Sequence, residues 1–191
     1  GVELIPCIQT LAHIRNIFRY SVYDSVRDFG DILLIDEPRT YELIENMFST
    51  LAECFTSRKV HIGMDEAFMV GLGNYRTKHG ICDRYDLLVR HLNKVVEIAK
   101  KYNFHPMMWS DMFFNLLDEK ADNFAEVQAK IPSSVQLIYW DYYSTEKKNY
   151  DEKFRLLQKS YNNVTSRQFG FNFSSIFHIF HSEYSYKYKK N

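Results

Sequence analysis

The pattern of apolar and polar residues divides most of the chain into alternating strands and helices. Hydrophobic side chains recur at helical spacing over Pro38–Phe55 and over Asp83–Tyr102, so each predicted helix has one wide apolar face. Further helical residues are expected over 112–130, in two pieces, and over 149–161. Near-continuous apolar runs predict four strands, at Val2–Cys7, Val60–Gly63, His105–Trp109 and Val135–Trp140.

The order of these elements predicts an α/β fold. Strands that alternate with helices at this spacing lie parallel and are joined by crossover connections. Before the first helix, residues 15–31 form a long connection with Gly30 near its end, and the apolar piece Ile32–Ile35 follows it. After Glu66, a segment with glycines at 71, 73 and 80 is expected to be long and irregular. We therefore expect about four parallel strand–helix units.

Chemically reactive or aromatic side chains follow each predicted strand. His13 follows the first strand, and the carboxylates of Asp65 and Glu66 follow the second. Because the carboxyl ends of parallel strands share one edge, these side chains are expected to meet in one site. The last two strands end in Trp109-Ser110-Asp111 and Trp140-Asp141-Tyr142.

Asp65 and Glu66 would point to opposite faces of a regular strand. To serve one pocket, the backbone must turn at the strand end, and we expect this turn at Met64. Trp109 and Trp140 at the next two strand ends are suited to stack on a sugar, which favours a carbohydrate pocket. The alternatives are an exposed acidic pair or a helix cap for the two acids, and ordinary core packing for each tryptophan.

Composition narrows the classes of function. A chain of 191 residues with 46% hydrophobic residues can bury the core of one domain. Its 24 basic and 24 acidic residues cancel, which argues against nucleic acid or a membrane as partner. No apolar run approaches the ~20 residues that span a bilayer. Cys7, Cys54 and Cys82 form no metal or disulfide motif and are expected to be reduced and mostly buried, so neither a metal nor another cofactor is predicted.

The final segment departs from this pattern, so we predict a catalytic domain over 1–163 and a divergent tail over 164–191. Aromatic residues lie among Ser and Lys there without a sustained helical or strand face. Phe169–Phe173 alternates briefly and is consistent with an added edge strand. The abrupt change suggests a replaced end, such as a shifted reading frame.

The residues around the acidic pair resemble a known family. His61-Ile62-Gly63-Met64-Asp65-Glu66-Ala67 is similar to the H-x-G-x-D-E signature of the family 20 glycoside hydrolases, the β-N-acetylhexosaminidases. Leu4–His13 resembles that family's third barrel strand and its histidine, Met108–Asp111 the fifth strand, and Tyr139-Trp140 the sixth. The resemblance covers about residues 1–160. It departs at Met64, where the family commonly has glycine, and before His13, where an acid and Pro-Gly are often found.

The resemblance implies a partial (β/α)8 TIM barrel that removes terminal GlcNAc or GalNAc from an oligosaccharide or glycoconjugate. The implied mechanism is retaining, with the substrate's 2-acetamido oxygen as nucleophile. Glu66 would act as acid and then base, Asp65 would orient the acetamido group, and His13 would be a supporting partner behind Glu66. The candidate substrate-binding residues are Trp109, Asp111, Trp140 and Tyr142.

A full barrel of this kind needs ~250 residues, so the resemblance also implies missing strands on both sides. The tail would cover one exposed edge, or a second copy would pair with it as a homodimer. No basic-then-apolar signal opens the sequence, and a cytoplasmic location is expected. Two alternatives remain: a non-catalytic carbohydrate-binding or assembly fragment, and a metal-dependent barrel hydrolase using His13, His61 and the two acids.

This incomplete pocket leads to the first prediction. The 191-residue chain alone should hydrolyse an aryl N-acetyl-β-glucosaminide little or not at all, because half of the sugar pocket is expected to be absent. The release of the aryl group is measured for the chain and for Glu66→Gln. Clear turnover that depends on Glu66 would contradict the prediction.

Overall fold

A computed structural model of the protein describes residues 1–116, 129–140 and 148. Several predictions lie outside these residues: residues 117–128 of the helical stretch expected over 112–130, Tyr142, the helix over 149–161 and the tail over 164–191. Within the described part, no helix is both long and apolar enough to cross a membrane.

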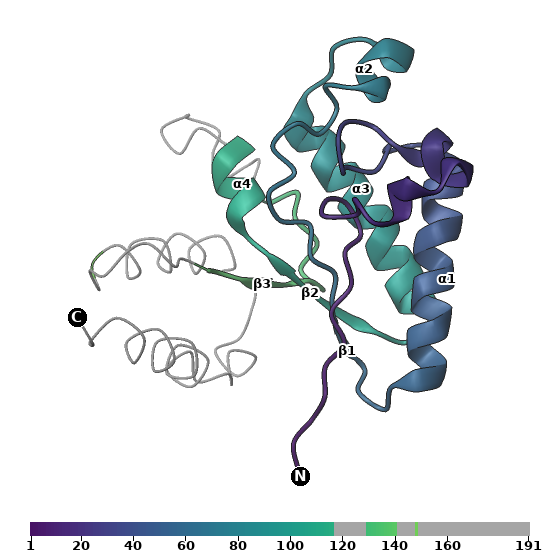
Figure 1. Ribbon diagram of the computed structural model, residues 1–191. Helices are drawn as coiled ribbons and strands as arrows, with labels where there is room; N and C mark the ends of the chain where they lie inside the picture. Colours follow the sequence, from purple (N-terminus) through teal and green to yellow (C-terminus); the bar gives the residue numbers. More distant parts are fainter. Residues whose placement is uncertain (117–128, 141–147, 149–191) are drawn as a thin grey trace, which may run out of the picture. The chain divides into compact units, whose positions relative to one another are not determined.

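The described part contains a parallel sheet whose strands follow one another in chain order (Figure 1). Strands β1 (Lys59–His61), β2 (His105–Trp109) and β3 (Gln136–Ile138) pair in the order β1-β2-β3. The N-terminal segment adds a parallel bridge on the free side of β1, between Cys7 and His61. The predicted α/β arrangement with parallel strands is confirmed.

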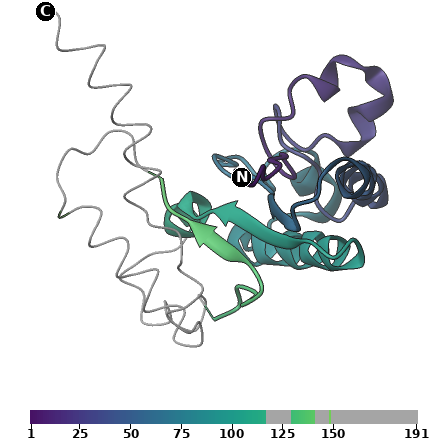
Figure 2. The same ribbon diagram turned by 90° about the horizontal axis from the view of Figure 1, so that it is seen from below.

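Two long helices pack against each other next to this sheet (Figures 1 and 2). Helix α1 (Pro38–Cys54) begins with proline in its first turn, and α3 (Arg84–Lys101) also contacts β2. The Asp83 carboxylate caps α3 by accepting the Asp86 N–H at 2.9 Å. The bounds of α1 and α3 lie within one residue of the predicted ones. Helix α4 (Asp111–Leu116) is the first of the two helical pieces predicted after β2.

The segment after Glu66 is more regular than its sequence predicts, because it contains a short helix, α2 (Asn74–His79). The buried Asp28 carboxylate holds it by accepting the N–H of Gly71 at 2.7 Å and of Tyr75 at 2.8 Å. Gly73 approaches so closely that a Cβ there would lie 2.2 Å from the Asp28 carbonyl oxygen. A carboxylate more than 40 residues away thus orders a segment that was expected to be irregular.

Pairing of the N-terminal segment with β1 begins later than the apolar residues of Val2–Cys7 predict. Val2 is fully exposed and Leu4 is 72% exposed, so the prediction of a buried strand from Val2 onward is wrong. The Pro6 carbonyl accepts the His61 N–H at 2.8 Å, and residues before it have no backbone hydrogen bond to β1. The apolar composition of this segment therefore did not show at which residue its backbone begins to pair with β1.

The cysteines also correct an expectation. All three are free, but Cys7 and Cys54 are exposed and Cys82 is half-buried, so the prediction of mostly buried thiols is wrong. Cys54 is the last residue of α1, where the helix already emerges from the core. The exposure of each cysteine is therefore set by where it lies in the fold, although a free thiol is usually buried.

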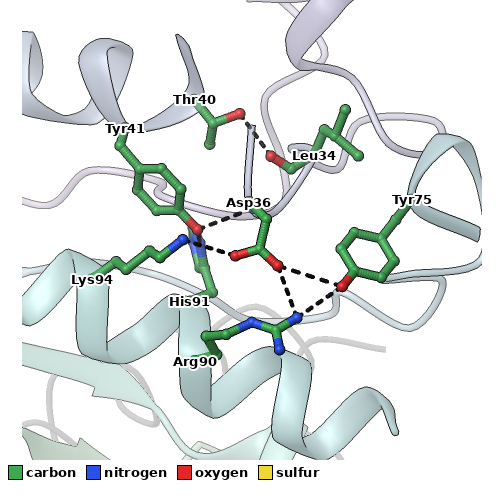
Figure 3. A network of polar contacts seen from close by, with 8 residues as sticks. All are labelled: Leu34, Asp36, Thr40, Tyr41, Tyr75, Arg90, His91 and Lys94. Carbon is green, nitrogen blue, oxygen red and sulfur yellow. Dashed lines mark hydrogen bonds and ion pairs between the residues drawn. The ribbon is translucent and has the colours of Figure 1, made fainter. Parts of the chain in front are cut away.

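An ion-pair network joins the loop before α1 to helix α3 (Figure 3). The Asp36 carboxylate lies 2.8 Å from both the Arg90 guanidinium and the Lys94 ammonium, and it accepts the Tyr75 hydroxyl at 3.4 Å. Burial opposes ionisation of Asp36, but Lys94 and Arg90 outweigh it and hold the pKa of this carboxyl below its usual range. The network therefore ties three separate segments together through one carboxylate.

His91, which lies next to the Tyr41 hydroxyl in Figure 3, extends this connection into the core. The His91 Nε2 lies 2.9 Å from the Thr10 carbonyl oxygen and Nδ1 lies 3.2 Å from the Tyr41 hydroxyl. Burial lowers the pKa of His91 to about 4, so the ring is neutral near pH 7. A carbonyl can only accept, so Nε2 carries the proton and Nδ1 accepts from Tyr41. The Thr10 hydroxyl in turn donates to the Ile62 carbonyl at 2.8 Å, which joins the helices to the end of β1.

The buried His91 predicts how stability depends on pH. Between about pH 6.5 and 4 the unfolded histidine binds a proton that the folded one does not, so the free energy of unfolding falls as pH is lowered, by about 1.4 kcal/mol per pH unit. Above about pH 6.5 this contribution is fully present. His91→Phe should be less stable at pH 7 by about 1–3 kcal/mol, since Thr10 and Tyr41 lose a partner, and should show a shallower pH dependence.

Urea unfolding at several pH values measures both effects. His105→Gln, which replaces an exposed histidine, is the control. An unchanged pH dependence in His91→Phe would contradict a neutral, buried His91.

Candidate active site

The backbone at the end of β1 turns so that two adjacent carboxylates reach one side. Gly63, Met64 and Glu66 have φ angles of +69°, +70° and +51°, all in the left-handed region. A regular strand would send Asp65 and Glu66 to opposite faces, whereas here both carboxylates lie near the His13 imidazole. The turn that the sequence predicts at Met64 is therefore present.

His13 lies between the two acids. Its Nε2 is 3.4 Å from Asp65 Oδ2 and 3.5 Å from Glu66 Oε2. The Asp65 side chain is only 16% exposed, whereas that of Glu66 is 42% exposed. The two neighbours therefore differ in environment: Asp65 is fixed among protein atoms and Glu66 faces the solvent.

Asp111 holds the main chain of Glu66 and the indole of Trp140. Its Oδ2 accepts the Glu66 N–H at 2.9 Å, and its Oδ1 accepts Trp140 Nε1–H at 3.4 Å. Burial raises the pKa of Asp111 and the charge of Asp65 adds to this, against the two hydrogen bonds that favour the carboxylate. The structure thus brings two of the predicted substrate-binding residues into contact with each other and with the acidic pair.

Trp109 stacks near the ring of His61, with centroids 4.3 Å apart and planes tilted by 51°. His61 Nδ1 accepts the Gly63 N–H at 3.1 Å, so the ring also supports the left-handed turn. Burial lowers the pKa of His61 to about 4, against the opposing charge of Asp65, and the ring is neutral near pH 7. His61 therefore supports the turn through Gly63 and contacts the Trp109 ring.

The sequence did not single out Gln9, whose Nε2 donates to Asp65 Oδ1 at 3.2 Å. Gln9 lies in the segment that leads to His13, but no local pattern indicates that its side chain reaches across to the next strand.

Within residues 1–116 and 129–140, no group of three or more His, Cys, Asp or Glu side chains is arranged to hold a metal ion.

Comparisons with known proteins identify the family of the chain. Residues 9–177 match the family described as glycosyl hydrolase family 20, catalytic domain. Human hexosaminidase D is 23% identical over 150 residues, which are 74% of this chain and 30% of that protein. The match to the family therefore covers the acidic pair and the described strands.

Solved structures show a similar fold. A Vibrio harveyi exo-β-N-acetylglucosaminidase superposes with a TM-score of 0.56 at 17% identity, over 82% of this chain and 25% of that chain. A β-N-acetylhexosaminidase from Bacteroides fragilis NCTC 9343 gives 0.56 at 16% identity, over 81% of this chain and 31% of that chain. The chain thus spans about a third or less of the length of these relatives.

The left-handed Met64 generates a prediction about stability. Its side chain is fully buried, so Met64→Gly and Met64→Ala should both destabilise the protein, by about 2–5 kcal/mol for alanine. Glycine relieves the left-handed strain, worth about 1–2 kcal/mol, and alanine does not. Met64→Gly should therefore be the more stable of the two, although glycine is usually the worse residue.

Thermal and urea unfolding of the two variants measure this difference. Ala12→Gly serves as the comparison, because Ala12 is equally buried and its φ is not positive. An alanine variant at 64 that equals or exceeds the glycine variant in stability would contradict the strained turn.

Proposed function

The chain belongs to glycosyl hydrolase family 20, and from this we propose that it carries the acid and the acetamido-orienting carboxylate of a β-N-acetylhexosaminidase. Its substrates are oligosaccharides or glycoconjugates that end in an N-acetyl-β-hexosaminyl residue. The observation that carries the proposal is the left-handed turn that brings Asp65 and Glu66 to one side, both within 3.5 Å of His13.

Glu66 is the general acid in this proposal. It donates its proton to the glycosidic oxygen while the carbonyl oxygen of the substrate's 2-acetamido group attacks the anomeric carbon. The bond to the leaving group breaks as the bond to the acetamido oxygen forms. Water then opens the cyclic intermediate, with Glu66 as the base that removes its proton, and the two inversions give net retention. The exposure of Glu66 supports this role, since it must meet both the leaving group and water.

Asp65 has a different role. Its carboxylate accepts the acetamido N–H, which turns the acetamido oxygen toward the anomeric carbon, and its negative charge stabilises the positive oxazolinium ring. An orienting group must itself be held, and Asp65 is 16% exposed with contacts to His13 and Gln9. His13 is the supporting partner of Glu66, and its Nε2 lies within 3.5 Å of both carboxylates.

Four aromatic and acidic residues complete the proposed sugar site. Trp109 and Trp140 enclose the acetamido methyl group, and Asp111 fixes the Trp140 indole and the Glu66 main chain. Tyr142 follows two positions after Trp140 and is proposed to contact the sugar.

The finer architecture is also a proposal. The segment around Cys7 and strands β1, β2 and β3 would be the third to sixth strands of a (β/α)8 barrel, which their parallel pairing in chain order supports. Because the chain spans 30% of the human relative, the activity and partners of the whole protein are inferred from the family. Pairing of two copies along a strand edge and a cytoplasmic location are proposals from the sequence.

Binding of an N-acetylglucosamine-derived thiazoline, a mimic of the cyclic intermediate, tests this function. The chain should bind it, and Asp65→Asn should weaken binding by about tenfold or more, since a hydrogen bond to a charged group is worth about 1.5–3 kcal/mol. Isothermal titration calorimetry measures the affinity. Glu97→Gln, which removes an exposed acid on α3, is the control.

Two results would contradict the proposed function. One is the absence of thiazoline binding to a folded chain. The other is equal affinity in the chain and in Asp65→Asn, which would mean that Asp65 does not contact the acetamido group.

A further inference from the structure

The Gln9 carboxamide lies between Gly63 and the Asp65 carboxylate. Its Nε2 donates to Asp65 Oδ1 at 3.2 Å, and its Oε1 is buried against Gly63. We propose that Gln9 is a positioning residue, which holds Asp65 through an uncharged hydrogen-bond donor in the orientation that the acetamido group requires. This inference rests on the proposed function and adds a residue to it.

Both the main chain and the side chain of Gln9 are fixed. The flanking Ile8 N–H donates to the His61 carbonyl at 2.8 Å and the Thr10 N–H donates to the Ile62 carbonyl at 3.2 Å. A Cβ at Gly63 would lie 2.0 Å from Gln9 Oε1, so only glycine leaves room for the carboxamide. The carboxamide is hydrogen-bonded at Nε2 and confined at Oε1, which is buried beside Gly63 without a hydrogen-bond partner among the described residues, so it loses little further freedom when it orients Asp65.

The hydrogen bond from Gln9 leaves the Asp65 carboxylate free to accept a further hydrogen bond from the substrate. Asp65 Oδ1 faces Gln9 and Oδ2 faces the His13 Nε2 at 3.4 Å, so rotation of the carboxylate is restricted from both sides. Each carboxylate oxygen accepts about two hydrogen bonds, which leaves capacity for the acetamido N–H. Gln9 and Asp65 thus form an orienting pair in which only one member is charged.

An uncharged partner matters because the proposed role of Asp65 depends on its negative charge. A carboxyl group at position 9 would have to share a proton with Asp65, since two carboxylates at hydrogen-bond distance cannot both ionise easily. A carboxamide donates to Asp65 at every pH, whereas a carboxyl group at position 9 could donate only when the pair holds a proton. Gln9 therefore orients Asp65 through a donor that carries no charge of its own.

Other groups face Asp65 and must be considered in any pH experiment. His13 is in direct contact, and Glu66 lies near the same ring nitrogen of His13, Nε2. The charge of Asp65 also acts on Cys7, His61 and Asp111. These groups are common to the chain and to its variants, so a change that appears only on substitution of Gln9 reports the contact between positions 9 and 65.

Two substitutions separate positioning from packing. Gln9→Met keeps the length of the side chain but removes the donor, and it should weaken thiazoline binding about tenfold at all pH values between 5 and 8. Gln9→Glu is isosteric but replaces the donor by an acid. It should weaken binding about tenfold or more at pH 8 and recover as pH falls toward 5, when one proton is shared with Asp65.

The test combines calorimetry at several pH values with ¹³C NMR titration of the side-chain carboxyl groups. In Gln9→Glu, Asp65 and the introduced carboxyl should titrate as a coupled pair, with one midpoint raised by at least about one pH unit relative to Asp65 in the chain. Gln136→Glu, an equivalent substitution on β3, is the control and should leave the Asp65 titration unchanged. Circular dichroism verifies that each variant is folded.

The outcomes distinguish this inference from the proposed function. If the chain binds thiazoline but Gln9→Met and Gln9→Glu bind it equally well at pH 8, Gln9 does not position Asp65 and the proposed function stands. If the chain does not bind thiazoline, the proposed function fails. The NMR titration still decides whether the contact exists: independent titration of the two carboxyl groups in Gln9→Glu would overturn the inference.

Discussion

The site depends on a backbone constraint at the end of β1. Three of the four residues from Gly63 to Glu66 adopt left-handed φ angles, and this turn is what allows neighbouring carboxylates to face one imidazole. Left-handed conformations are costly outside glycine, so the surrounding structure has to stabilise them. The Asp111 carboxylate accepts the Glu66 N–H, His61 accepts the Gly63 N–H, and the Met64 side chain is fully buried.

These stabilising contacts connect the turn to the rest of the fold. Thr10 links His91 of α3 to the Ile62 carbonyl, one residue before the turn begins. His91 reaches Tyr41 of α1, whose hydroxyl also accepts the Asp36 N–H beside the ion pairs of Figure 3. Helix packing and the geometry of the acidic pair are therefore connected through hydrogen bonds between neutral groups, of which those of Thr10 are buried, as a preorganised site requires.

Local spacing was sufficient to predict the two long helices, the parallel order of the strands and the turn at Met64, but not the short helix α2. The acidic pair could also be found, since it lies at a strand end. The contacts of Gln9, Asp28 and Asp111 could not be predicted, because each joins residues more than 40 positions apart and depends on strand register. The roles and helices predicted for residues outside the described ranges, including the role of Tyr142, stay predictions.

The central claim is that the left-handed turn at Gly63–Glu66 places Asp65 to orient the acetamido group and Glu66 to act as acid and base in the same reaction. A crystal structure of the chain with the bound thiazoline tests it most directly. The account predicts the thiazoline nitrogen within hydrogen-bond distance of an Asp65 oxygen, at about 2.7–3.0 Å, and Glu66 next to the anomeric carbon on the leaving-group side. A ligand bound away from both carboxylates, or one whose nitrogen contacts Glu66 instead of Asp65, would contradict it.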